Sequence, residues 1–391
     1  MKALRLYAKK DPKPDYKLSE FEIKTGKILE GSKVWRYPEL RIEEVEKPKI
    51  GPKDLLIRVK ACGICGSDLH FYETDEEKYI LYPGLTKFPC TIGHEFSGVV
   101  EEVGSSVKNF KVGDCVTAEE MLWCGECIPC RNGFPNHCRN LEELGFTVDG
   151  AMAEYVKVES KYCWKIDSLL DAYKSEEKLY EAGSLVEPTS VAYNALFIRA
   201  GGFKPGAYVA VYGAGPIGLA SIQLAKAAGA SKIIVFEIVP ERATLAKDIG
   251  ADYAFNPIEL ERRGESPSEK IMEITGGFGA DVQVEAAGSP TKTLPEMEKA
   301  LAINGKIVWI GRAEKAASIT MERFQTRRGQ VFGSQGHSGH EIFQNVIRLM
   351  ASRKIDMTKI ITKRFKLEEA IDALKEASKR IDAKITIKSG E

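Results

Sequence analysis

The chain has 391 residues, of which 43% are apolar and 29% charged, with 56 basic and 56 acidic side chains. This length allows two domains, and the balanced charge argues against a nucleic-acid-binding protein, which usually carries a basic excess. No apolar run approaches the ~20 residues that cross a bilayer, and the basic segment 1–10 lacks the apolar core of a secretory signal. We therefore expect no membrane association and a cytoplasmic location. Only 14 residues are Asn or Gln, and with the high charge content this composition is typical of thermophiles.

The first part of the chain contains patterns of β structure. Short runs at 3–6, 41–45 and 55–59 predict strands. Residues 92–117 alternate apolar and polar side chains around glycines, as an antiparallel sheet does. A charged stretch at 9–33 shows little periodicity.

From residue 207 onward, predicted strands alternate with predicted helices. The pattern predicts strands at 207–212, 232–236, 281–285 and 306–310, and helices at 216–228, 241–249 and 340–352. Pro216 suits the first turn of a helix, where its missing N–H is not needed. This alternation indicates a parallel, doubly wound sheet.

Four of the nine cysteines stand close together in the sequence, at Cys124, Cys127, Cys130 and Cys138. An odd number of cysteines without a secretory signal argues against a disulfide framework. Zinc prefers four tetrahedral ligands, and a closed shell of four thiolates is structural rather than catalytic. We therefore predict a structural zinc site.

An iron–sulfur cluster is the alternative interpretation of this spacing. Ferredoxin runs also open with C-x2-C-x2-C, but their fourth cysteine follows after three residues and precedes a proline. Here seven residues intervene and Arg139 follows, which favours zinc. A zinc ribbon that binds nucleic acid is disfavoured by the zero net charge.

Two earlier segments carry a mixed set of metal-binding side chains. The first is GICGSDLH at 63–70, which contains Cys65, and the second is GHE at 93–95, which contains His94 and Glu95. A thiolate, an imidazole and a carboxylate suit catalytic zinc with an open position. Asp68 is placed to accept a hydrogen bond from the other nitrogen of His94 and so to fix its tautomer.

A dinucleotide-binding signature lies at the start of the alternating region. Its GxGxxG consists of Gly213, Gly215, Pro216, Ile217 and Gly218 with Ala214, between a predicted strand and a predicted helix. Glu237 follows nineteen residues later at the end of the next strand, as the fingerprint requires. Its carboxylate would bind the adenosine ribose and repel a 2′-phosphate, which favours NAD over NADP. Arg242 would contact the ribose or adenine, or alternatively tolerate a phosphate.

Taken in chain order, these motifs resemble the zinc-containing medium-chain dehydrogenase family over nearly the whole chain. The resemblance implies a mostly-β, GroES-like catalytic domain at 1–190 and 340–391. It also implies a Rossmann domain at 191–339, two zinc ions per subunit, one catalytic and one structural, and NAD as cofactor. A non-catalytic relative would have lost zinc ligands, and none is missing here.

The resemblance also implies roles for individual residues. Cys65, His94, Glu95 and Glu187 match the ligands of the catalytic zinc, the last position being Glu in polyol-type members. Ser67 and His70 match a proton relay that runs through a cofactor ribose hydroxyl to solvent. Asp68 matches the partner of the zinc histidine.

The charges of this ligand set suggest a further hypothesis. One thiolate and two glutamates carry three negative charges against two positive charges on zinc. A net negative centre is poor at stabilising an alkoxide. We therefore hypothesise that Glu95 or Glu187 leaves the metal when substrate binds.

Later strand ends supply the remaining candidate residues. Ala287 and Ile310 lie near ends that line the cofactor crevice in open α/β sheets, and the resemblance places them near the nicotinamide. Gln335 and His337, in GSQGHSGH at 333–340, are candidates for substrate contact. A glycine-rich turn that caps the next helix through Ser338 is the alternative.

Several segments look like a subgroup that acts on cyclic polyols and their ketones, the inososes of inositol catabolism. These segments are EEMLWC at 119–124, SLVEPTSVAYNA at 184–195 and GSQGHSGH, together with the N-terminal region and the stretch 73–88. The aromatic residues Phe71, Tyr72, Tyr79 and Tyr82 either line the mouth of the site or pack. L-Threonine 3-dehydrogenase, 2,3-butanediol dehydrogenase and sorbitol dehydrogenase are the alternatives. The family implies a homo-oligomer, a dimer or a tetramer.

Overall fold

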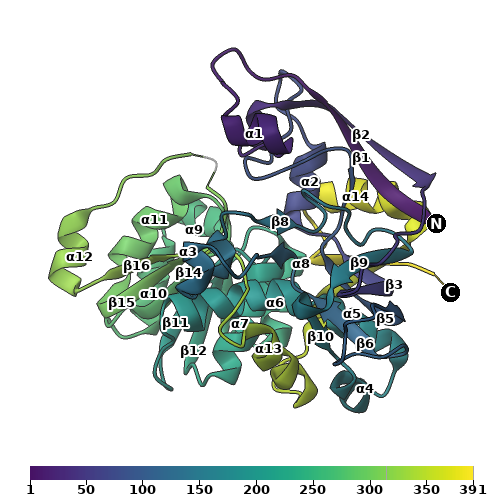
Figure 1. The fold of residues 1–391 in the computed structure, drawn as a ribbon. Coiled ribbons are helices and arrows are strands. Elements are labelled where there is room, and N and C mark those ends of the chain that lie inside the picture. The colour runs from purple at the N-terminus through teal and green to yellow at the C-terminus, as the bar shows by residue number, and fades with distance from the viewer. Residues whose placement is uncertain (314, 391) are drawn as a thin grey trace. The chain divides into compact units, whose positions relative to one another are not determined.

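The computed structural model describes residues 1–313 and 315–390, which form two compact units (Figure 1). The first unit comprises Met1–Glu187, Ile361–Arg380 and the chain from Lys384 onward, and the second comprises Pro188–Ile360 and Ile381–Ala383. The predicted boundary at residue 340 falls inside the second unit. Helix α13 (Ile342–Ala351) is tied to that unit because the Asn345 amide donates to the Tyr193 hydroxyl at 3.3 Å.

The first unit is built mostly from antiparallel strand pairs, as predicted, although its last two strands pair in parallel. Its largest sheet has the order β10-β6-β5-β3-β18-β17, with β9 also pairing with β3, and a second sheet has the order β2-β1-β4. The strands are β1 (Lys2–Lys10), β2 (Trp35–Glu44), β3 (Asp54–Gly63), β4 (Cys90–Thr91), β5 (Glu95–Val103), β6 (Cys115–Ala118), β7 (Met121–Leu122), β8 (Glu142–Glu143), β9 (Tyr155–Glu159), β10 (Cys163–Lys165), β17 (Ile361–Lys366) and β18 (Lys384–Lys388). The helices are α1 (Glu20–Thr25), α2 (Gly66–Tyr72), α3 (Ile128–Arg131), α4 (Ser168–Tyr173), α5 (Glu176–Ser184) and α14 (Ala370–Ser378), and α6 (Val186–Tyr193) begins here.

The charged stretch at 9–33 contains a short helix that its periodicity did not indicate. Helix α1 begins with a capping box, in which the Ser19 hydroxyl accepts from the Glu22 N–H and the Glu22 carboxylate accepts from the Ser19 N–H. It ends at Gly26 with a φ of 71°. The stretch then pairs with the segment 73–88 through a bridge between Ile28 and Thr86, so two of the segments typical of the subgroup fold against each other.

The aromatic residues of this region pack rather than line an opening. Phe71 and Tyr82 are buried and their ring centroids lie 4.8 Å apart. Phe71 also lies 5.0 Å from Phe146, whose ring lies 4.8 Å from the ring of His94. Tyr79 is also buried, and Tyr72 is half-buried. The aromatic cluster therefore supports a predicted metal ligand from behind.

The second unit contains the predicted parallel sheet, with the order β13-β12-β11-β14-β15-β16 (Figure 1, teal to green). All of its strand pairs are parallel. The strands are β11 (Tyr208–Tyr212), β12 (Lys232–Phe236), β13 (Tyr253–Phe255), β14 (Ala280–Glu285), β15 (Leu301–Trp309) and β16 (Gln330–Gly333). The helices, besides α13 and the end of α6, are α7 (Pro216–Ala227), α8 (Pro240–Ile249), α9 (Pro257–Arg262), α10 (Pro267–Ile274), α11 (Pro290–Lys299), α12 (Met321–Arg327) and a π-helix (Asn194–Arg199).

The topological switch point of this sheet, where successive connections change direction, lies between β11 and β14. Chain connections run from β11 toward β13 on one side and from β14 toward β16 on the other. Ligands of such sheets bind at this point, outside the carboxyl ends of the strands. Within residues 1–313 and 315–390, the helices are all too short or too polar to cross a bilayer.

Candidate metal and cofactor sites

The four-cysteine cluster has the geometry of a closed metal site. The sulfur atoms of Cys124, Cys127, Cys130 and Cys138 lie within 4.8 Å of one another, and all four cysteines are free of disulfides. The Cys127 sulfur lies 3.5 Å from that of Cys130 and 3.9 Å from that of Cys138. Four sulfurs around zinc at ~2.3 Å in a tetrahedron are separated by ~3.8 Å. The cluster therefore fits a zinc ion that completes its shell with thiolates.

Backbone N–H groups already point at these sulfur atoms. The N–H groups of Glu126 and Cys127 donate to the Cys124 sulfur at 3.4 Å, and that of Arg139 donates to the Cys127 sulfur at 3.5 Å. The donors to Cys124 lower its pKa to about 6. The backbone N–H groups of Cys130 and Arg139 lower the pKa of Cys127, whereas burial raises that of Cys138. Hydrogen bonds to sulfur favour the thiolate that binds metal.

The mixed site forms where three neighbouring strands come together. Strand β5 begins at Glu95, which is paired with Gly63 at the end of β3, and β18 pairs with β3 on its other side. Cys65 follows β3 and His94 precedes β5. The ligand atoms of Cys65, His94 and Glu95 lie within 4.8 Å of one another. The structure thus brings three of the predicted ligands together, and their donor set fits zinc.

Two glycines make this arrangement possible. A Cβ at Gly63 would collide with the Glu95 carboxylate, so only glycine lets that side chain lie across the strand end. Gly93 has a φ of 92°, and a Cβ there would lie 2.5 Å from Met152. Glycine adopts such a φ without the strain that other residues incur, and the turn directs His94 inward.

Lys384 is a member of the site that sequence analysis missed. Its ammonium group is fully buried, forms an ion pair with the Glu95 carboxylate, and donates to the Ile64 carbonyl at 2.9 Å. Although burial lowers it, the charge of Glu95 raises the pKa of Lys384 above its usual value. The residue therefore supplies a fixed positive charge. No local signal marked it, because Lys384 is 289 positions from Glu95 in the chain.

Asp68 lies beside His94, although the two are farther apart than the predicted hydrogen bond requires. Its carboxylate is fully buried, with one oxygen 3.7 Å from the His94 Nδ1 and the other accepting from the Cys65 N–H at 2.8 Å. Burial lowers the pKa of His94, but the Asp68 charge and the Cys65 sulfur raise it well above its usual value. A carboxylate behind a ligand histidine orients the ring toward the metal.

Helix α2 carries both residues of the predicted relay. Ser67 and His70 are three positions apart, so they share one face of the helix. The Ser67 hydroxyl is buried without a hydrogen-bond partner among the described residues. His70 is half-exposed, with its Nδ1 3.6 Å from the Glu73 carboxylate. One end of the pair is enclosed and the other reaches solvent, as a relay requires.

Glu187, the fourth predicted ligand, lies close to this site but is not part of the group formed by Cys65, His94 and Glu95. It is buried, and its charge raises the pKa of both His94 and Lys384. Its carboxylate lies within 4.8 Å of that of Glu120, another buried residue. Glu120 was not predicted individually, although it belongs to the EEMLWC segment.

The glycine-rich turn of the second unit has the form that the fingerprint requires. Gly213 has a φ of 91°, and a Cβ at Gly218 would collide with the Gly213 carbonyl, so the turn and the helix pack closely. A Cβ at Gly215 would meet no atom within 4 Å. Helix α7 opens at Pro216 and Ile217 with Gly215 as its N-cap. Its free N–H groups suit a pyrophosphate.

Glu237 is connected directly to this turn. Its carboxylate accepts from the N–H of Ala214 and, at 2.9 Å, from that of Val239. Arg242 donates instead to the carbonyl oxygens of Ile381 and Asp382, at 3.2 and 2.7 Å. These bonds give Arg242 a structural role, and its predicted contact with the cofactor stays a prediction.

The other candidates lie at the carboxyl ends of their strands or just beyond. Ala287 is exposed and Ile310 is half-buried. Gln335 is exposed, whereas His337 is buried with its ring 5.1 Å from that of Phe343.

The segment around Gln335 is held by a side chain of the π-helix. The Asn194 amide donates to the carbonyl oxygens of Gln335 and Gly336 at 3.3 and 2.8 Å. The N-cap of α13 is Glu341 rather than Ser338, and the Glu341 side chain makes no capping hydrogen bond.

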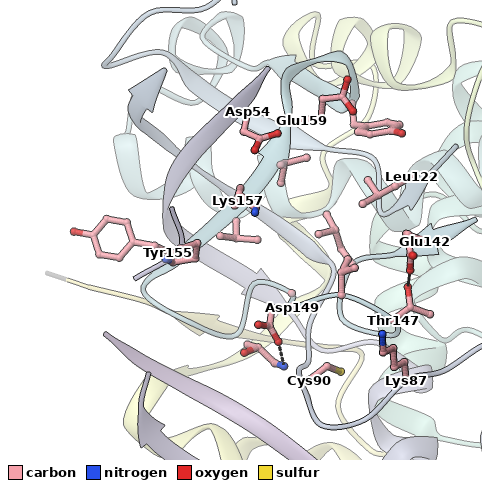
Figure 2. A pocket seen from close by; sticks show the side chains of 18 of the residues that line it. Asp54, Lys87, Cys90, Leu122, Glu142, Thr147, Asp149, Tyr155, Lys157 and Glu159 are labelled. Atoms are coloured by element: carbon pink, nitrogen blue, oxygen red, sulfur yellow. Dashed lines mark hydrogen bonds between the residues drawn. The ribbon is translucent and has the colours of Figure 1, made fainter. Parts of the chain in front are cut away.

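A separate groove of about 750 Å³ opens on the first unit (Figure 2). Its walls include Cys124 of the four-cysteine cluster but, among the described residues, none of those predicted to act in the reaction. Glu142 and Asp149 point toward it, and Glu142 accepts a hydrogen bond from Thr147 (Figure 2). Asp149 is paired with Arg5.

Comparison with known families identifies the class of the protein. Residues 51–168 match the alcohol dehydrogenase GroES-like domain, and residues 216–352 match the zinc-binding dehydrogenase domain. The chain therefore belongs to the zinc-binding dehydrogenases of the alcohol dehydrogenase type. This confirms the predicted fold class, the oxidoreductase activity and the choice of zinc over an iron–sulfur cluster.

Individual relatives agree with this assignment. The chain is 52% identical over 386 residues, 96% of each chain, to a protein of Thermotoga maritima named scyllo-inosose 3-dehydrogenase. It is 36% identical to an L-threonine 3-dehydrogenase of Pyrococcus abyssi, over 85% of this chain and 91% of the relative. A solved structure of an alcohol dehydrogenase from Thermotoga maritima superposes with a TM-score of 0.95 at 50% identity, covering 99% of this chain and 100% of the other.

Proposed function

We propose that the protein is an NAD-dependent dehydrogenase of cyclic polyols, with the activity of a scyllo-inosose 3-dehydrogenase. The observation that carries this proposal is the 52% identity to the Thermotoga maritima protein of that name over 96% of both chains. The threonine dehydrogenase is less similar and matches only 85% of this chain. The segments 9–33 and 73–88, which pair through Ile28 and Thr86, give the first unit a feature beyond the shared motifs.

The metal site supports alcohol oxidation. Zinc held by Cys65, His94 and Glu95 would polarise a bound hydroxyl, and the nicotinamide would accept hydride. Ser67 would take up the hydroxyl proton, and His70 would pass it to solvent. Asp68 keeps the His94 ring oriented while this happens.

Lys384 alters the charge count of the site. One thiolate and two glutamates carry three negative charges, and zinc together with Lys384 carries three positive charges. These charges balance one another before a substrate binds, and the buried Asp68 carboxylate beside His94 adds one further negative charge. Because Lys384 gives Glu95 a partner that does not depend on the metal, we favour Glu95 over Glu187 as the carboxylate that exchanges.

Glu237 supports NAD as the preferred cofactor. A carboxylate at this strand end accepts hydrogen bonds from the ribose hydroxyls and repels a 2′-phosphate. Replacing Glu237 by Ser should lower kcat/KM for NAD and raise it for NADP, whereas a variant that still excludes NADP would contradict this role.

A substrate panel tests the proposal directly. Reduction of NAD should be followed at elevated temperature with inositols, sorbitol, 2,3-butanediol and L-threonine, and oxidation of NADH with inososes. We expect the highest kcat/KM for a cyclic polyol or its ketone. A higher value for threonine or butanediol would replace the proposed substrate class while leaving the dehydrogenase assignment intact.

We also propose that the protein acts in the cytoplasm as a homo-oligomer. Closed symmetric dimers and tetramers are the common forms of soluble enzymes. Light scattering coupled to size-exclusion chromatography tests the assembly, and a monomeric mass would contradict it.

A further inference from the structure

Glu285 is a buried carboxylate with no role in the chemistry described above. It is the last residue of β14 and its side chain is fully buried. Burial raises the pKa of Glu285 above its usual value, although the N–H donors around it oppose this. Burying a carboxylate is unfavourable unless hydrogen bonds compensate, so its contacts indicate what it does.

The carboxylate holds the turn that follows β14. One oxygen accepts from the Gly288 N–H at 3.1 Å, and the other accepts from the Ser289 N–H and the Thr293 hydroxyl, both at 3.3 Å. Ser289 is the N-cap of α11, and its own side chain makes no capping bond. Glu285 therefore fixes the turn 286–289 and the first turn of the helix.

The backbone of the same residue holds the end of the neighbouring strand. The Glu285 carbonyl accepts from the N–H groups of Ile310 and Gly311 at 3.0 and 2.9 Å. A Cβ at Gly311 would lie 2.5 Å from both a carboxylate oxygen of Glu285 and the nitrogen of Gly288. Two turns are thus packed against one side chain.

This pair of turns lies beside the glycine-rich turn. Strands β11 and β14 are neighbours in the sheet, with Tyr212 opposite Glu285. A Cβ at Gly213 would lie 3.0 Å from the Cα of Ala287. The three turns therefore meet at the switch point, where a dinucleotide binds.

We propose that Glu285 is a positioning residue for the nicotinamide half of the cofactor, because it fixes the backbone of the turns at Ala287 and Ile310. The carboxylate acts through these turns and need not contact the cofactor. The inference rests on the proposed NAD binding and on the expected placement of Ala287 and Ile310 beside the nicotinamide, and it does not depend on which alcohol is the substrate.

Comparison of two ligands tests this role. NADH contains the nicotinamide ring, whereas ADP-ribose has both riboses and the pyrophosphate but lacks that ring. Titration calorimetry measures the affinity of both for the zinc-loaded enzyme. In Glu285→Ala, NADH should bind about tenfold more weakly, since hydrogen bonds to charged groups contribute more than neutral ones. ADP-ribose should bind within about twofold of the wild type, because the glycine turn and Glu237 are intact.

A matched variant separates positioning from general damage. Gln283 is a buried polar residue two positions earlier on β14, where its amide donates to the Met297 carbonyl at 2.7 Å. Gln283→Leu should lower the melting temperature without changing the ratio of the two affinities.

Glu285→Gln keeps the volume but turns one acceptor into a donor, and it carries the test if Glu285→Ala does not fold. A selective loss of NADH affinity in either variant supports the proposal. An equal loss for both ligands, or no loss for either, would overturn it.

Discussion

The two metal clusters differ in how far apart their ligands lie in the sequence. The four cysteines occupy one segment, 124–138, and short turns with local N–H donors hold them. The mixed site collects Cys65, His94 and Glu95 from two segments and Lys384 from the far end of the chain. The four-cysteine cluster therefore depends mainly on the conformation of one segment, whereas the mixed site requires the whole sheet to be folded.

The clusters also differ in charge and access. Backbone N–H groups around the four-cysteine cluster stabilise thiolates, and four sulfurs leave no open position. The mixed site has a buried cation, a buried carboxylate behind its histidine and a relay helix beside it. These additions are what we expect of a site that changes its charge during turnover. The predictions below separate the two roles.

The largest effect is expected from Cys65→Ser. Loss of the thiolate should lower kcat by more than about 10³-fold, since metal polarisation of the hydroxyl is lost. Elemental analysis should find one zinc per chain instead of two. Retention of both zinc ions with normal turnover would show that Cys65 is not a ligand.

His70→Ala should have the next largest effect. Removing a general acid–base group lowers kcat by about 10²-fold near neutral pH. NADH affinity and zinc content should be unchanged, and added imidazole should restore part of the rate. Unchanged turnover across pH would exclude His70 from the relay.

Lys384→Met should weaken the mixed site selectively. Loss of a residue that holds a metal ligand typically lowers metal affinity about 10- to 100-fold, and competition with a chelator measures this. One zinc per chain, that of the four-cysteine cluster, should resist the chelator as in the wild type.

Lys388→Met is the matched control for this change. Lys388 lies on the same strand but forms an exposed pair with Glu177, and exposed pairs contribute about 1 kcal/mol or less. Equal zinc loss in both variants would refute the role of Lys384.

Cys127→Ser should have the smallest effect on turnover. The variant should lose one zinc and melt at a lower temperature, because metal binding stabilises the fold. The kcat of the folded fraction should stay within about fivefold of the wild type, as the reacting groups are untouched. A loss of kcat as large as that of Cys65→Ser would show that the four-cysteine cluster also takes part in turnover.

Much of the fold followed from local patterns. The alternation from residue 207 predicted the strands β11 and β12 and the helix α7 between them, because buried parallel strands are mostly apolar and helices are often bounded by proline and glycine. Helix α1 was not predicted because its segment lacks apolar periodicity. Its capping signals were nevertheless present in the sequence, with Ser19 and Glu22 at its start and Gly26 at its end.

Three of the predicted ligands, Cys65, His94 and Glu95, lie close together, whereas Glu187 lies outside that group and two supporting side chains were not predicted. Lys384 looked like an ordinary strand lysine, and Glu285 like an ordinary strand-end glutamate. Neither has a local signature, since their partners are distant in sequence or are backbone groups. The sequence analysis assigned no individual role to Asn194. Its hydrogen bonds to residues 335–336 come from the first residue of a π-helix.

By itself, the sequence determined the class of the protein. Metal ligands within a short segment and glycines at fixed offsets are constrained by local chain geometry, so their spacing can be read directly. The tertiary structure alone decided which charges balance the mixed site and which buried groups hold the cofactor turns. Which charges are buried and paired depends on which strands are neighbours, and the order of strands cannot be predicted from any single segment of the chain.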